Sequence, residues 1–91
     1  MYSDLFFSII SFTKKEIEKL AEMEHGRWNA ERLSEGWKPD PVKDMIKKVN
    51  PFLVSWTMLP ESIREWDRST IKKLPALLAE IGYEVYKKQG K

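Results

Sequence analysis

The chain of 91 residues has no cysteine, one histidine and four glycines. Without cysteine it cannot form disulfides or zinc–thiolate sites, and thiol catalysis is excluded. A transition-metal site would need His25 together with several carboxylates, and no glycine has the spacing of a GxGxxG or GxxxxGK phosphate loop. No serine lies in the sequence context of a nucleophile elbow. We therefore predict that the protein is not an enzyme and holds neither a metal nor another cofactor.

Long apolar runs are also absent. Residues 5–12 (LFFSIISF) are apolar but too few to span a bilayer, and they lack the basic region and cleavage site of a signal peptide. We expect no membrane insertion, and the absence of cysteine favours a cytoplasmic location. We assign residues 1–12 to an apolar N-terminal segment. It either docks on the domain or marks where a preceding domain was cut away, and docking is favoured because an exposed apolar patch promotes aggregation.

Neither sign of charge dominates the chain. Sixteen basic and 14 acidic residues are interspersed, and the net charge is +2. Such a balance produces no strong electrostatic field, so we do not expect nucleic acid as a partner.

The most regular feature that is present is a long helical pattern in the first half of the chain. Thr13 followed by Glu16 has the spacing of a capping box, which predicts a helix start. Gly36 can adopt the left-handed conformation that commonly ends a helix. These signals predict a helix over residues 14–35.

A second helical pattern begins near Pro60, a residue suited to the first turn of a helix. It extends over residues 61–81 and ends at Gly82. Pro75 lies inside this pattern, which predicts either a kink or two abutting helices with Pro75 opening the second.

Three short segments are predicted to be extended, near residues 37–38, 52–56 and 83–86. The 52–56 segment is an apolar run that reads either as a short strand or as a buried loop. The 83–86 segment (YEVY) reads as a short strand that can pair with the backbone near 37–38. Together these patterns predict a mainly α fold with a minor β contribution, in a single domain over residues 13–87.

Residues 25–37 (HGRWNAERLSEGW) are the part of the chain most dense in functional groups. His25, Trp28 and Arg32 are spaced to share one helix face, where they can form the wall of a pocket. The indole would stack on a planar ligand, the guanidinium would bind an anionic group and the imidazole would fix the ligand's orientation. In the alternative reading, Trp28 belongs to the core, His25 is its hydrogen-bonded neighbour and Arg32 pairs with a carboxylate such as Asp67.

Several other polar and aromatic residues leave two interpretations open. Glu24 and Glu31 fall within the apolar arc of the first helix, so either they pair with arginines or this face borders a polar cavity. Trp56 ends an irregular run, a position where binding residues concentrate. Arg68 is either part of an ion pair between helices or an anion-binding group.

Several short motifs occur in a fixed order along the chain. They are His25-x-x-Trp28, Gly36-Trp37, Pro51-x-Leu53-Val54, Leu59-Pro60-Glu61, Asp67-Arg68 and Leu77-Leu78-x-x-Ile81-Gly82-Tyr83. Their order and spacing resemble the RyR domain, the module named for ryanodine receptors, over roughly residues 17–86. The chain departs from the family pattern in the connecting loop, where it has Pro39-Asp40 and Val54-Ser55-Trp56.

This resemblance implies a small helical module without known catalysis, of the type that occurs as a single copy in bacterial and phage proteins. In the receptors the repeats occur in pairs that are associated with adenine nucleotides. It therefore implies a ligand-sensing domain that binds a nucleotide-like anionic small molecule, and a homodimer or a fused partner domain that restores the pair. The alternative is a protein–protein interaction or homodimerisation module whose aromatic residues serve only as core and interface.

The residues of interest fall into two groups. The expected ligand-binding residues are His25, Trp28, Arg32, Trp56, Glu24 and Arg68. The residues expected to maintain the family's structural motif are Gly36, Trp37, Pro51, Leu53, Asp67 and Gly82.

Overall fold

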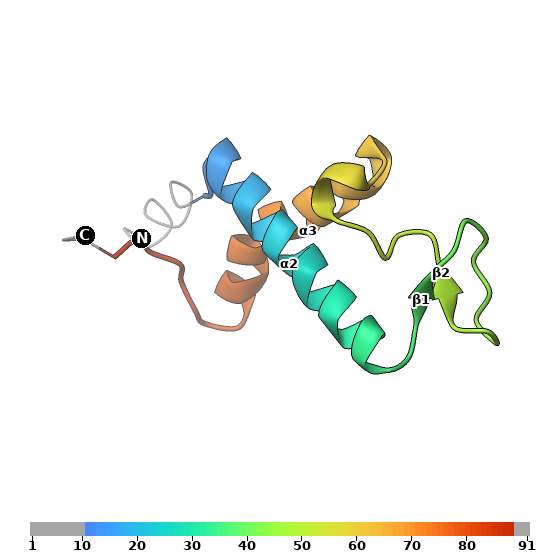
Figure 1. Ribbon diagram of the computed structural model, residues 1–91. Helices are drawn as coiled ribbons and strands as arrows, with labels where there is room; N and C mark the ends of the chain where they lie inside the picture. Colours follow the sequence, from blue (N-terminus) through green and yellow to red (C-terminus); the bar gives the residue numbers. More distant parts are fainter. Residues whose placement is uncertain (1–10, 89–91) are drawn as a thin grey trace, which may run out of the picture.

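Two long helices cross, and a small sheet lies beyond the end of the first helix (Figure 1). The computed structural model describes residues 11–88, so residues 1–10 of the predicted N-terminal segment lie outside the described part. The fold is mainly α with a minor β contribution, as predicted. The elements in chain order are α2 (Lys14–Ser34), β1 (Lys38–Pro39), β2 (Val49–Asn50), the 3-10 helix η1 (Trp56–Met58) and α3 (Glu61–Glu80).

The predicted capping signals define both ends of α2. The Thr13 hydroxyl accepts a hydrogen bond from the Glu16 amide (3.1 Å), and the Glu16 carboxylate accepts one from the Thr13 amide (2.8 Å). At the other end Gly36 has a φ of +92°, and the Trp37 amide donates to the Arg32 carbonyl (3.0 Å). This is the Schellman arrangement, in which a glycine is favoured because it adopts positive φ without strain.

Helix α3 is continuous through Pro75, so the alternative of two abutting helices is wrong. Pro60 is the N-cap of α3 and lies just outside the first turn. Pro75 has no amide to donate to the carbonyl one turn earlier. The helix persists there because Ile71 is buried in the core and Leu74 packs against it.

The sheet consists of two short parallel strands. Lys38 of β1 is paired with Val49 of β2, which confirms the extended segment predicted near residues 37–38. The chain between them closes through an antiparallel bridge from Asp44 to Val49. The Asp44 carboxylate accepts hydrogen bonds from the Ile46 and Lys47 amides (3.0 and 3.2 Å), which orders this loop.

The other two extended predictions have different outcomes. Residues 52–56 form the buried loop and not the strand of the two readings: a turn at Pro51 and Phe52 leads by an irregular path into η1, and Leu53 and Trp56 are buried. Residues 83–86 are irregular and do not pair with β1. The backbone partner of β1 is β2, and the Tyr83 amide donates to the Leu78 carbonyl (2.9 Å) where α3 ends.

The core lies where α2, η1 and α3 meet. Its buried members are Ile17 and Ala21 of α2, Trp56 of η1, Leu59, and Ile71 of α3. His25 is also buried, so the inward face of α2 carries Ile17, Ala21 and His25. No helix within residues 11–88 is long and apolar enough to cross a membrane.

Candidate ligand site

His25 attaches the loop before η1 to α2. Its Nε2 lies 2.7 Å from the Val54 carbonyl oxygen, and the Asn29 side-chain amide donates to the same oxygen (2.9 Å). Because a carbonyl oxygen only accepts, Nε2 must carry the proton. The imidazole is 5% exposed, so its first role is to satisfy a buried carbonyl.

Trp28 and Arg32 form a stack next to this histidine. The Trp28 ring lies 5.7 Å from the His25 ring at an interplanar angle of 19°. The Arg32 guanidinium lies 5.5 Å from the Trp28 ring and 6.0 Å from the Trp37 ring. Cation–π contacts of this kind hold a guanidinium without occupying all of its hydrogen-bond donors.

A cavity of about 130 Å³ lies between α2, α3 and the loop before η1. Its volume is well below the roughly 300–1,000 Å³ of typical ligand pockets, so it accommodates a flat ring and not a whole nucleotide. Four of its six lining residues are apolar or aromatic, and two carry carboxylates. The lining residues are Glu24, His25, Trp28, Phe52, Ile63 and Asp67.

The two carboxylates of the cavity differ in their surroundings. Glu24 is bonded to Arg27 at 2.7 and 2.9 Å, and this pairing lowers the pKa of Glu24. Burial raises the pKa of Asp67, although the nearby His25 acts in the opposite direction. Within residues 11–88 the Asp67 carboxylate has no ion-pair partner. Asp67 is therefore the acceptor that remains available to a ligand in this cavity.

Arg68 of α3 and Trp56 of η1 belong to a different cluster and do not line the cavity. The Arg68 guanidinium donates to Glu18 of α2 (2.7 Å), and to Glu61 and Glu65 of its own helix. It lies 5.7 Å from the Trp56 ring, and the Trp56 indole donates to Glu18 (2.8 Å). Arg68 is thus the interhelix ion pair that was one of its two predicted roles.

The glutamates of the first helix pair with arginines, which was the first of their two predicted roles. Arg27 contacts Glu24 and also Glu31 (3.5 Å). Arg32 contacts Glu31 (3.2 Å) and Glu35 (3.6 Å). Arg32 thus pairs with carboxylates, as the packing interpretation predicted, but within residues 11–88 its partners are Glu31 and Glu35 and not Asp67, the example given.

The structure thus brings four predicted residues together at the cavity or beside it, namely Glu24, His25, Trp28 and Arg32. Trp56 and Arg68 do not line the cavity, although the Trp56 ring lies 6.2 Å from the His25 ring. Asp67, predicted as a motif residue, lines the cavity. The other predicted motif residues shape the backbone or the packing. Gly36 and Gly82 have positive φ, Leu53 is buried, Pro51 forms a turn and Trp37 is half-buried.

Three residues of the site were not predicted. Asn29 lies one helical turn after His25, and that spacing indicated that both side chains reach the same loop. Phe52 and Ile63 line the cavity from the loop and from α3. No local sequence signal identifies them, because their position depends on how α3 crosses α2.

One protein-family model matches most of this chain. The RyR domain model matches residues 7–87, which is nearly the whole chain. The match contains all the helices and strands described above and every residue of the cavity. The chain therefore belongs to the RyR domain family.

Proposed function

We propose that this RyR domain is a non-catalytic ligand-sensing module that binds a nucleotide-like anionic small molecule. The observation that carries the proposal is the cavity beside Trp28, where a partly buried Asp67 carboxylate with no ion-pair partner among residues 11–88 faces aromatic walls. Arg32 lies next to this cavity, stacked on Trp28. An aromatic surface, an acceptor and a cation in this order suit a flat heterocycle that carries an anionic group.

The volume and the charges define how such a ligand would bind. A cavity of about 130 Å³ admits the heterocycle alone, so the sugar and the anionic group stay outside it. An amino group on the ring edge would donate to Asp67, because a carboxylate only accepts when it is ionised. The anionic group would lie toward Arg32, since the carboxylates of the cavity repel it.

Calorimetric titration with AMP, ATP and cyclic AMP tests the proposal. We expect at least one of them to bind with a Kd below about 1 mM, and Trp28→Ala and Asp67→Ala to abolish the heat of binding. Trp66→Ala is the matched control, because Trp66 lies on α3, is 70% exposed and does not line the cavity. Circular dichroism of each variant establishes that it is folded.

The proposal fails if none of these nucleotides binds tighter than the millimolar range. It also fails if Trp66→Ala weakens binding as much as Trp28→Ala does, because the heat would then not come from the cavity.

An interaction or homodimerisation module is the second candidate, and an exposed apolar face of α3 favours it. Trp66, Leu77 and the neighbouring Ile81 are 70%, 54% and 69% exposed. Exposed apolar surface of this kind is typical of an interface, either with a second copy or with a fused domain. Sedimentation equilibrium would then detect a dimer that Trp66→Ala dissociates and Trp28→Ala leaves intact. A cytoplasmic location fits both candidates.

A further inference from the structure

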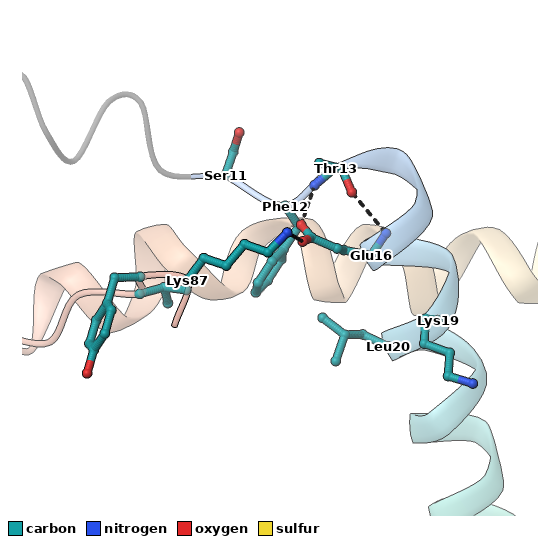
Figure 2. A pocket seen from close by; sticks show the side chains of 9 residues that line it. Ser11, Phe12, Thr13, Glu16, Lys19, Leu20 and Lys87 are labelled. Carbon is teal, nitrogen blue, oxygen red and sulfur yellow. Dashed lines mark hydrogen bonds and ion pairs between the residues drawn. The ribbon is translucent and has the colours of Figure 1, made fainter. Parts of the chain in front are cut away.

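A groove larger than the ligand cavity lies at the opposite end of α2. Figure 2 shows it between the start of α2 and the segment after α3, with the Phe12 and Leu20 side chains along it and Lys87 reaching toward Glu16. Its volume is about 630 Å³, which is within the usual range of ligand pockets. Size alone would therefore make it a second candidate ligand site.

The chemistry of the groove suits an apolar occupant. Phe12, Leu20 and Val85 form its apolar lining, and the first two also pack against the core. Its carboxylate, Glu16, is occupied by the Thr13 amide of the capping box and lies 3.7 Å from the Lys87 ammonium. A small-molecule site normally adds a few convergent polar groups to its apolar walls, and here the carboxylate that could serve is already engaged.

The chain supplies an apolar segment at the edge of this groove. Ser11, the first described residue, lines the groove itself, and the six residues before it are LFFSII. Six extended residues reach roughly 20 Å, which is enough to cover a groove of this size. The match to the RyR domain begins at residue 7, so the family unit includes most of this segment.

We propose that residues 5–10 of the same molecule occupy this groove and complete the domain's core, so that the groove is not a ligand site. The segment removes its own apolar side chains and the walls of the groove from water together. Binding of a segment of the same chain does not depend on the protein concentration, because its attachment at Ser11 keeps it next to the groove. This inference is independent of the ligand proposed above, which concerns the other end of α2.

Nuclear Overhauser contacts in the unaltered, uniformly labelled 91-residue chain test the proposal. We expect contacts from the methyl groups of Leu5, Ile9 or Ile10 to those of Leu20 and Val85. An isotope-filtered experiment on a mixture of labelled and unlabelled chains separates contacts within one molecule from contacts between two. Contacts seen only between molecules would overturn the proposal in favour of a second copy, and the absence of any contact would overturn it altogether.

A matched pair of variants gives an independent readout. Val85→Ser places a hydroxyl in the groove, whereas Val42→Ser makes the same exchange at a loop position that is 71% exposed. We expect Val85→Ser to shift the Ile9 and Ile10 methyl resonances and to lower Tm by about 4–8 °C, as a loss near 1 kcal/mol does in a domain of this size. Val42→Ser should do neither. Equal effects of the two exchanges would contradict the proposal.

Discussion

The His25 ring lies next to the tryptophan of each of two tryptophan–arginine clusters, and the environments of these clusters differ sharply. In the first, Trp56 is 7% exposed and Arg68 donates to carboxylates on both helices. In the second, Trp28 is half-buried beside a cavity, and Arg32 lies over its ring and pairs with the solvent-exposed Glu31 and Glu35. The same residue types therefore stabilise the fold in the first cluster and leave a surface available to a ligand in the second.

The difference lies in whether the donors are satisfied within the chain. The Trp56 indole and the Arg68 guanidinium converge on Glu18, which joins η1 and α3 to α2. A network whose members satisfy one another stabilises the fold and leaves nothing for a ligand. The cavity beside Trp28 instead contains Asp67, a carboxylate whose pKa is raised by burial and which has no ion-pair partner within residues 11–88.

The largest expected effect comes from truncating the two tryptophans. Trp56→Ala should lower the free energy of unfolding by about 3–5 kcal/mol, because it empties the core, and Trp28→Ala by only about 1–2 kcal/mol. Urea denaturation measures both values. Equal losses would mean that the two clusters do not differ in the way described.

Truncating the two arginines should give the next largest difference. Arg68→Met retains an apolar stem but removes the bonds to Glu18, and we expect Tm to fall by about 4–8 °C. Arg32→Met loses contacts with exposed glutamates and the cation–π contacts with Trp28 and Trp37, so its Tm should fall by less, about 2–4 °C. Differential scanning calorimetry checks this, and a larger loss for Arg32→Met would contradict it.

The pH dependence of stability tests the Glu18 network. Hydrogen bonds from Arg68 and Trp56 lower the pKa of Glu18 below its ordinary value of 4.5. A lowered folded-state pKa contributes stability above the ordinary value, and that stability disappears as the pH falls through the folded-state pKa. Glu18→Gln should therefore lower Tm at pH 7 and have a shrinking effect below about pH 4. A difference that persists undiminished at pH 2 would show that the carboxylate charge is not involved.

The pH dependence of stability due to Asp67 should be opposite in sign to that due to Glu18, and its effect should be the smallest of those predicted. Burial raises its folded-state pKa above the ordinary 3.8, so ionisation at neutral pH opposes folding. Asp67→Asn should leave Tm unchanged or raise it slightly at pH 7, and the gain should vanish near pH 3, where the carboxyl is protonated in both states. Thermal melts at the two pH values measure this, and a marked loss of stability at pH 7 would contradict it.

Local signals in the sequence predicted the helices because their ends are defined locally. Thr13 and Glu16 cap α2, and Gly36 ends it, through contacts within a few residues. The strand predicted at residues 83–86 was wrong because strand pairing depends on distant backbone, and β1 pairs with β2 instead. Likewise no pattern within α2 shows that Trp56 and Trp28 end in different environments, since Trp56 contacts Glu18 and Arg68, which lie 38 and 12 residues away from it in the sequence.

The indole resonances of the four tryptophans test the central claim most directly. Each indole N–H gives its own signal in a nitrogen–proton correlation spectrum, so titration with AMP reports on all four environments at once. We predict that the Trp28 signal shifts with the ligand concentration while the buried Trp56 signal and the remote Trp66 signal do not. Movement of the Trp56 or Trp66 signal without movement of Trp28, or no movement of any, would contradict the assignment of the ligand site to the cavity beside Trp28.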